Sequence, residues 1–351
     1  MALPATFRKL VATKISTNFR SAVSIQTVPM QKPGPDEVLV RNRYVGINAS
    51  DINKTAGRYD PTVNTPQTNL GMESIGNIVE VGSDVKHLKR GQSVCFMEAG
   101  AYSEYKIVNS KVIAPVPAVK PEYIGLLVSG LTADIAFREM GNLKKGETVL
   151  ITAAAGGTGQ FAVQYAKLAG CHVVGTCSTD SKAQFLKGIG CDRAINYKTE
   201  NLNDVLKKEY PKGIDVVYES IGGEMFHTCL KNLARKGRLI IIGFITGYKE
   251  DAMAAPTVTS VEMYMILAKA ITLSGFFLLQ YMSKIPESLA RQVHLFDKGL
   301  VSVQMDSGQK NGKGPFKGIE EIVDAVEYLY TGKSAGKVFV EVNEALPVAR
   351  I

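Results

Sequence analysis

The spacing of apolar residues is most regular in the middle of the chain. Short apolar runs rich in β-branched residues recur there, at 148–152, 172–177, 193–197, 213–220, 238–244 and 271–277. Between most of them apolar residues recur with a helical period, in the segments 161–170, 182–190, 202–210 and 224–237. Strands and helices that alternate in this way predict an α/β fold with a doubly wound parallel sheet. Several of them contain continuous apolar stretches, VLI, VV and LIII, which are typical of a sheet covered on both faces.

The two ends of the chain follow other patterns. Glycine and proline interrupt short β-branched runs up to about residue 125, and no long helical period occurs, so we predict a β-rich, barrel-like module. After residue 286 the chain carries one helical segment, IEEIVDAVEYLY, and one strand, GKVFVEV. These two elements cannot form a core alone, so we expect them to fold back onto the N-terminal module. The segment 247–268 shows no regular pattern and is interpreted as an insertion or lid.

A glycine-rich stretch lies where the first central strand passes into the first central helix. Its pattern is Ala154-x-Gly156-Gly157-x-Gly159. Gly156 and Gly157 would allow a tight turn that brings backbone N–H groups against a pyrophosphate, and Gly159 would allow the helix to pack closely on the strand. The alternative is a glycine-rich connector without a ligand. Because further βα units follow, the stretch predicts a dinucleotide site of the Rossmann type.

The end of the second central strand indicates which dinucleotide binds. An NAD site usually has an acidic residue about 20 positions after the glycines, but Thr176 and the three residues after it are small and neutral. We assign Asp180 as the N-cap of the next helix. Lys182 then falls in the first helical turn, where the helix dipole disfavours a cation, unless a 2′-phosphate pairs with it and with Ser178. The alternative for Lys182 is an ordinary surface lysine. The pattern favours NADP.

Composition and charge exclude several other classes of protein. The 351 residues carry a net charge of +8, but lysine and arginine are scattered, so nucleic acid is not expected as the main partner. No apolar run reaches the ~18–20 residues of a membrane span, and the N-terminus lacks the apolar region of a secretory signal. The five cysteines have no paired spacing, which suits free thiols in a reducing compartment.

The cysteines and the four histidines also lack the spacing of a zinc site, so we expect no metal. Without a Lewis acid, conjugated acceptors are easier to reduce than simple ketones, and such a site needs hydrogen-bond donors for the developing oxyanion and a proton source. The candidates are Asn48 and Tyr59, in the segment 43–61. The alternatives are that Asn48 and Asp51 cap the following helix and that Tyr59 is a packed aromatic residue.

Several motifs together resemble one enzyme family. VGINASDIN, AAAGGTGQFAVQYAK, STDSK, INYKTE, YESIGGEMF and GRLIIIGF are similar to the zinc-free quinone oxidoreductase branch of the medium-chain dehydrogenase/reductase superfamily. The resemblance extends over nearly the whole chain. It implies a GroES-like catalytic domain formed by residues 1–125 and the return segment 286–351, around a Rossmann NADP-binding domain at 126–285.

The resemblance also implies an activity, which is NADPH-dependent reduction of the C=C bond of α,β-unsaturated ketones such as 15-oxo-prostaglandins, at their 13-position. The alternatives are a general NADPH quinone or aldehyde reductase and a non-catalytic NADPH-binding protein. Position by position, the implied cofactor contacts beyond the three glycines are Thr158, Ser178, Lys182, Tyr197, Ser220, Ile242, Tyr248, Phe276, Phe277, Leu278 and Ser334. The relatives usually have asparagine where this chain has Ser334.

Partners and location follow from the same reasoning. The expected partner is a small, lipid-like enone, and both a homodimer and a monomer remain open. The last three residues, Ala349, Arg350 and Ile351, are a small–basic–aliphatic variant of the Ser-Lys-Leu peroxisomal address. The expected location is therefore the peroxisome, with the cytoplasm as the alternative.

Overall fold

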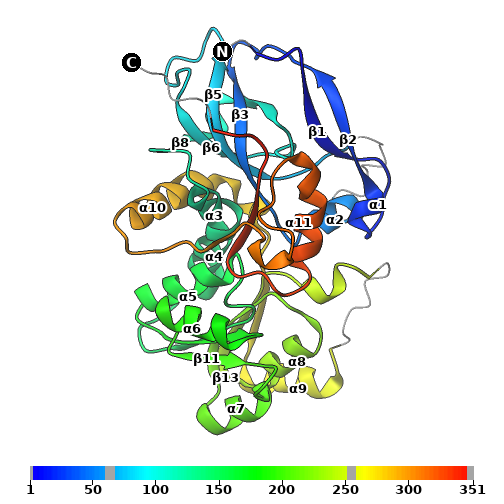
Figure 1. Ribbon diagram of the computed structural model, residues 1–351. Coiled ribbons are helices and arrows are strands. Elements are labelled where there is room, and N and C mark those ends of the chain that lie inside the picture. The colour runs from blue at the N-terminus through cyan, green and yellow to red at the C-terminus, as the bar shows by residue number, and fades with distance from the viewer. Residues whose placement is uncertain (1–2, 60–67, 251–257, 346–351) are drawn as a thin grey trace. The chain divides into compact units, whose positions relative to one another are not determined.

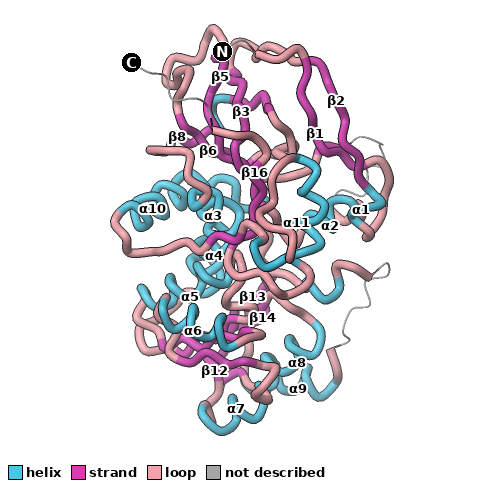
Figure 2. Tube along the Cα trace, viewed as in Figure 1, coloured by secondary structure: helices cyan, strands magenta, loops and turns pink. Residues whose placement is uncertain are grey.

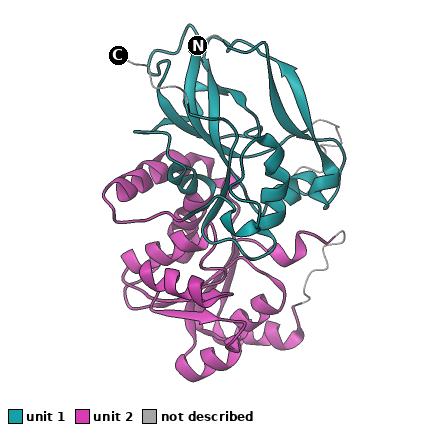
Figure 3. Cartoon of the chain, viewed as in Figure 1, with its two compact units in different colours: residues 1–128, 305–351 teal, residues 129–304 magenta. Residues whose placement is uncertain are grey.

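The computed structural model describes residues 3–59, 68–250 and 258–345. The chain divides into two compact units (Figure 3): unit 1 comprises residues 1–128 and 305–351, and unit 2 comprises residues 129–304. The second boundary lies 19 residues after the predicted one at 285. Helix α10 (Ile285–Asp297) therefore belongs to unit 2, where the Ser288 hydroxyl donates to Asp134 of α4 (Leu131–Ala136) at 2.6 Å.

Unit 2 contains one sheet, whose strands are drawn in Figures 1 and 2. The sheet has six strands, and every neighbouring pair is parallel. The strand order is β11-β10-β9-β12-β13-β14, which is the order of a doubly wound sheet whose direction reverses beside β9. The strands are β9 (Thr148–Ile151), β10 (His172–Cys177), β11 (Arg193–Asn196), β12 (Ile214–Glu219), β13 (Leu233–Ile241) and β14 (Thr272–Gly275). The predicted fold class is confirmed.

Helices cover this sheet on both faces. On one face, Leu150 and Val217 of the sheet pack with Leu206 and Leu230, which come from α7 and α8. Strand residues whose side chains point to the other face, such as Val149, are also fully buried. The helices of this unit are α4, α5 (Gly159–Leu168), α6 (Asp180–Gly188), α7 (Leu202–Glu209), α8 (Gly223–Lys231), α9 (Ser260–Lys269) and α10, with the shorter helical turns η3 (Phe137–Gly141), η4 (Ile245–Gly247) and η5 (Leu278–Lys284). The turn η2 (Leu126–Gly130) begins in unit 1 and ends in unit 2.

Two predictions about the elements of unit 2 are wrong, one about the end of a helix and one about a segment without regular structure. The helix predicted over 224–237 ends at Lys231, because Leu233 is fully buried and pairs with Ile214 as the first residue of β13. The segment predicted as an irregular insertion contains helix α9, which begins with a reciprocal capping box between Thr259 and Glu262. Residues 251–257 of that segment lie outside the described residues.

Unit 1 is built from both ends of the chain and is rich in strands. A three-stranded sheet has the order β2-β1-β4, and a seven-stranded sheet has the order β15-β16-β3-β5-β6-β8 with β7 also paired to β3. The strands are β1 (Thr6–Ala12), β2 (Val23–Pro29), β3 (Glu37–Gly46), β4 (Thr68–Asn69), β5 (Glu73–Val81), β6 (Ser93–Met97), β7 (Tyr105–Asn109), β8 (Ile113–Pro115), β15 (Met305–Asp306) and β16 (Lys337–Glu341).

The C-terminal segment completes the larger sheet of unit 1. Strand β16 runs antiparallel to β3, with Phe339 opposite Gly46. The helices of this unit are short: α1 (Phe19–Ala22), α2 (Asp51–Thr55), α3 (Glu122–Gly125), α11 (Ile322–Leu329), η1 (Ser110–Val112), η6 (Gln309–Asn311) and η7 (Ile319–Glu321). Across the parts of the chain that the structure describes, no helix combines the length and the apolar character that crossing a membrane requires.

Candidate active site

The glycine loop of unit 2 joins β9 to α5 beside the strand-order reversal. Ala153 has a positive φ of 47°, a conformation that residues with a Cβ seldom adopt. Hydrogen bonds hold it there: its N–H donates to the Thr176 hydroxyl at 3.2 Å, and its carbonyl accepts from Gly156 N at 2.8 Å. Strain of this kind is characteristic of ligand-binding loops.

Helix α5 starts unusually close to this loop. A Cβ at Gly159 would lie 2.4 Å from Ala153 O and 2.7 Å from Ala154 Cα, so only glycine allows this approach. A Cβ at Gly156 would lie 3.1 Å from the same Ala153 oxygen. The helix has neither a side-chain cap nor an acidic residue in its first turn. An uncapped first turn, approached by a glycine loop, suits the pyrophosphate of a dinucleotide.

Thr158 is the N-cap residue of α5, but its hydroxyl is used within unit 2. It donates to Ser129 O at 3.0 Å and shares a 2.7 Å hydrogen bond with the Tyr218 hydroxyl. Desolvation raises the pKa of the buried Tyr218 above its ordinary value, and the bond to Thr158 partly opposes this. The side chain of Thr158 thus anchors the loop, and its backbone is the part that remains for a ligand.

Ser178 and Lys182 lie together at the end of β10. They are only 8% and 9% exposed, and Lys182 Nζ lies 3.5 Å from Ser178 Oγ. The predicted N-cap is wrong: Thr179 caps α6, because its side chain accepts from Lys182 N, while Asp180 accepts from Asn196 Nδ2 at 2.8 Å. The Lys182 amine and the Ser178 hydroxyl are buried side by side, and the nearby Asp180 carboxylate is hydrogen-bonded to the Asn196 amide. This arrangement suits a 2′-phosphate.

Tyr197 follows β11 on the neighbouring strand. Its N–H donates to Cys177 O at 3.0 Å, which places its backbone next to the strand end that carries Ser178. Its side chain is exposed. An exposed aromatic ring beside this strand end can stack on a planar ligand group.

The end of β12 carries an acid that the sequence did not single out. Glu219 is fully buried and accepts from the backbone N–H groups of Ile221 and Gly222 at 2.8 and 3.0 Å. Burial raises the pKa of Glu219, whereas these backbone hydrogen bonds lower it. The adjacent Ser220 hydroxyl is buried without a hydrogen-bond partner among the described residues. Since buried hydroxyls are rarely left unpaired, Ser220 fits a site completed by a ligand hydroxyl.

The remaining predicted cofactor residues of unit 2 follow β13 and β14. Ile242 N donates to Glu219 O at 2.7 Å, and the buried Tyr248 accepts from Phe244 N at 3.4 Å. Phe276 stacks on Tyr281 with ring centroids 4.9 Å apart. Phe277 is exposed and Leu278 is buried. Together with the glycine loop and Ser178, these residues follow the carboxyl ends of the parallel strands, where dinucleotides bind in doubly wound sheets.

Unit 1 contains the predicted donors. Asn48 lies in a buried polar cluster with Glu73 and Lys337: its Nδ2 donates to Glu73 Oε1 at 2.9 Å, and its Oδ1 accepts from Lys337 Nζ at 2.6 Å. Asp51 also contacts Asn48, because its carboxylate accepts from Asn48 N at 2.8 Å, and it accepts from the Tyr102 hydroxyl at 2.5 Å. The N-cap of α2 is Ser50, which makes no side-chain capping bond.

Tyr59 and Ser334 lie elsewhere in unit 1. Tyr59 is 39% exposed, and its hydroxyl accepts from Asn53 Nδ2 at 3.2 Å. Ser334 is half-buried in the loop before β16. The structure thus links Asn48 to the buried cluster and Tyr59 to Asn53 in the middle of α2.

Glu73 and Lys337 were missed at the sequence level. Glu73 is the first residue of β5 and Lys337 is the first residue of β16. An ionisable residue at the start of a strand was the available signal, but nothing in the sequence indicated that these two would meet.

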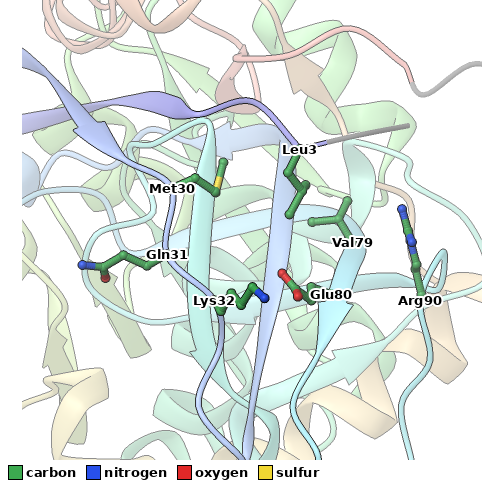
Figure 4. A pocket seen from close by; sticks show the side chains of 7 residues that line it. All are labelled: Leu3, Met30, Gln31, Lys32, Val79, Glu80 and Arg90. Carbon is green, nitrogen blue, oxygen red and sulfur yellow. The ribbon is translucent and has the colours of Figure 1, made fainter.

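The described residues show no metal-binding cluster, and they form a surface pocket away from the predicted site residues. They contain no group of three or more His, Cys, Asp or Glu side chains that could hold a metal, and all five cysteines are buried free thiols. A surface pocket of about 400 Å³ lies in unit 1 (Figure 4). It is lined by Leu3, Met30, Gln31, Lys32, Val79, Glu80 and Arg90. None of the predicted site residues lines it.

Comparison with known proteins places this geometry in context. A zinc-binding dehydrogenase model matches residues 157–294, and an alcohol dehydrogenase GroES-like domain model matches residues 34–118. Prostaglandin reductase-3 of Mus musculus is 50% identical, over 97% of this chain and 90% of its own. A 2-alkenal reductase (NADP(+)-dependent) of Nicotiana tabacum is 30% identical, over 90% of this chain and 91% of its own. The crystal structure of Escherichia coli quinone oxidoreductase complexed with NADPH matches with a TM-score of 0.80 and 26% identity, and the match covers 95% of this chain and 99% of that one.

Proposed function

The chain belongs to the prostaglandin reductase-3 family, in the quinone oxidoreductase-like branch of the medium-chain dehydrogenase/reductase superfamily, and from this premise we propose that it is an NADPH-dependent enone reductase. The observation that carries the proposal is a dinucleotide-binding loop after β9 together with the buried Ser178 and Lys182 at the end of β10. The chain that contains them is 50% identical to a prostaglandin reductase-3.

The residues of unit 2 fit NADP as the cofactor. The glycine loop and the start of α5 receive the pyrophosphate, and Ser178 with Lys182 receives the 2′-phosphate. Ser220 offers a buried hydroxyl, which has no partner among the described residues, to a ribose or to the nicotinamide end. When bound, NADPH supplies the hydride that saturates the substrate.

The polar residues of unit 1 fit two other requirements of the reaction, which are stabilisation of the oxyanion and supply of a proton. Reduction at the β-carbon moves negative charge onto the carbonyl oxygen, and hydrogen-bond donors stabilise this oxyanion. Asn48 and Tyr59 are the candidate donors. The α-carbon then takes a proton from Tyr59 or from solvent, and the carbonyl is restored.

We propose lipid-like enones as the substrate class and 15-oxo-prostaglandins, reduced at the 13-position, as its first candidates. The support is the similarity of the chain to proteins named prostaglandin reductase-3. The test follows NADPH oxidation with a panel of 15-oxo-prostaglandins, short enones, quinones and aldehydes, with identification of the products. We expect the saturated ketone with its carbonyl intact. An allylic alcohol would identify a carbonyl reductase, turnover of quinones alone would identify a quinone reductase, and NADPH binding without turnover would identify a non-catalytic binding protein.

We further propose that catalysis needs no metal. The support is the chemistry of the donor set, since the described residues bring no three potential ligands together. Elemental analysis of active protein should find no stoichiometric zinc, and chelators should leave the rate unchanged. One zinc per chain would overturn this proposal.

We also propose that two copies of the chain associate through unit 2. Strand β14 pairs only with β13 among the described strands, and α9 exposes Val261, Met263, Tyr264 and Leu267. An unpaired strand edge and an apolar helix face favour self-association. Light scattering after size exclusion should give a dimer that Leu267→Glu weakens, whereas a concentration-independent monomer would contradict the proposal.

The location is proposed from the C-terminal tripeptide, which lies outside the described residues. Ala349, Arg350 and Ile351 support import into peroxisomes. A protein tagged at its N-terminus should co-localise with a peroxisomal marker, and deletion of the tripeptide should release it to the cytosol. Diffuse cytosolic signal with the tripeptide intact would reject this location.

A further inference from the structure

A buried ion pair contacts the side-chain amide of Asn48 in unit 1. Lys337 Nζ and Glu73 Oε1 are 2.5 Å apart, and their side chains are 2% and 0% exposed. Removing two charges from water is expensive, and a buried pair often adds little net stability compared with apolar residues. The energetic disadvantage of this pair suggests that it serves a purpose other than stability.

The ion pair fixes the orientation of the Asn48 side chain. The amide oxygen accepts from Lys337 Nζ at 2.6 Å, and the amide nitrogen donates to Glu73 Oε1 at 2.9 Å. An ammonium group can only donate and a carboxylate can only accept. Rotating the amide by half a turn would place its NH₂ against the ammonium and its oxygen against the carboxylate, so the pair permits one orientation.

The surrounding contacts hold the same three residues in place. The second oxygen of Glu73 accepts from Val128 N at 2.7 Å, so neither oxygen of this carboxylate is without a donor. The backbone N–H of Asn48 donates to Asp51 at 2.8 Å. With its backbone and both ends of its amide bonded, Asn48 has one polar hydrogen left: the second hydrogen on Nδ2, which has no acceptor among the described residues.

We propose that Lys337 and Glu73 are positioning residues, which direct this remaining Asn48 N–H toward the carbonyl oxygen of the bound enone. Asn48 is then the catalytic residue, because it contacts the oxygen on which charge develops. This inference rests on the proposed enone reductase function. It adds that Lys337 and Glu73 fix the orientation of the Asn48 amide, which would otherwise be free to rotate.

The proposal predicts a specific pattern in a double-mutant cycle. Lys337→Met removes the ammonium and keeps a long apolar chain, and Asn48→Ala removes the donor. Each single variant should lower kcat for an enone by on the order of 100- to 1,000-fold, the range for loss of one oxyanion donor, with the NADPH dissociation constant changed less than about threefold. In the Asn48→Ala background, Lys337→Met should lower kcat little further, because the residue through which it acts is absent.

Two measurements separate positioning from a merely structural role. The first is the thermal midpoint of the cofactor-free protein, which reports its stability. The double variant Lys337→Met with Glu73→Gln removes both charges, so it should keep the fold while its kcat stays low. Side-chain amide NMR of selectively labelled, cofactor-free protein should show the Asn48 NH₂ resonances shifted in Lys337→Met. The matched control is Lys9→Met, since Lys9 donates to Asn69 at 3.2 Å near the surface of the same unit.

The outcomes are distinguishable from failure of the proposed function. If the wild-type protein reduces no enone, the proposed function fails. If it does reduce enones but Asn48→Ala retains kcat, the positioning inference is wrong while the function stands. The inference is also overturned if Lys337→Met lowers kcat equally in the presence and absence of Asn48, because that result assigns Lys337 an effect of its own.

Discussion

Gly46 lies so close to Glu73 that a Cβ at Gly46 would be 2.3 Å from Glu73 Oε1. Gly46 is the last residue of β3 and Glu73 is the first residue of β5. The missing side chain leaves the space in which the buried carboxylate meets Lys337 and Asn48. Gly46, at the end of β3, thus makes room for the polar cluster.

Gly46→Ala should therefore displace Glu73 and destabilise the fold by about 1–3 kcal/mol, the usual range for overpacking a core. Urea unfolding measures this change. The matched control is Gly275→Ala, another strand glycine, whose Cβ would meet nothing within 4 Å. Equal loss of stability in both variants would show that glycine itself, and not the space beside Glu73, is what matters.

Asp51 should make the stability of the protein depend on pH. Burial raises the pKa of Asp51 from 3.8 to about 6, although the hydrogen bond from Tyr102 opposes the shift. Between these values the folded protein binds a proton that the unfolded chain has released, so this group lowers stability as pH rises from about 4 to 6. Asp51→Asn removes this penalty.

Unfolding free energies at pH 4 and pH 7 test this effect. Relative to wild type, Asp51→Asn should gain about 2–3 kcal/mol between the two pH values, which corresponds to a shift of about two pKa units. Asp84→Asn, which removes an exposed carboxylate of the same unit, is the control. A pH-independent difference between Asp51→Asn and wild type would contradict the prediction.

Lys182 should discriminate between the two nicotinamide cofactors. Lys182→Ala removes the buried amine beside Ser178, and we expect NADPH binding to weaken by about 1–3 kcal/mol, with NADH binding nearly unchanged. Fluorescence titration measures both constants. Lys187→Ala, an exposed lysine on the same helix, should change neither. An equal loss for NADPH and NADH would reject the assignment of the 2′-phosphate to Lys182.

Tyr59 should contribute to turnover and not to cofactor binding. Tyr59→Phe removes the hydroxyl that accepts from Asn53, and kcat for an enone should fall by roughly tenfold or more if that hydroxyl stabilises the oxyanion. The NADPH dissociation constant should stay the same. The control is Tyr44→Phe, since Tyr44 packs edge-on against Phe339 in the same unit. An unchanged kcat in Tyr59→Phe would remove this residue from the mechanism.

Local periodicity carried most of the information about unit 2. Strands β9 to β14 were all predicted, because each is a short apolar run and most of these runs are separated by helical periods. The errors fell where tertiary pairing overrides local preference. The segment 234–237 continues a helical pattern, but Leu233 pairs with Ile214 and starts the strand early. The N-cap of α6 moved by one residue, because Asp180 meets Asn196 on the next strand instead of the helix start.

The sequence by itself determined the doubly wound sheet, the glycine loop at its first turn and the neutral end of the second strand. These features depend on residues that are neighbours along the chain, so their spacing is visible without a structure. The tertiary structure alone decided the buried cluster around Asn48. Lys337 reaches Asn48 from 289 positions away, and Glu73 from 25, because β16, β3 and β5 lie side by side in one sheet. Strand pairing between distant segments leaves no local pattern, so the partners of Asn48 became visible only once the sheet was formed.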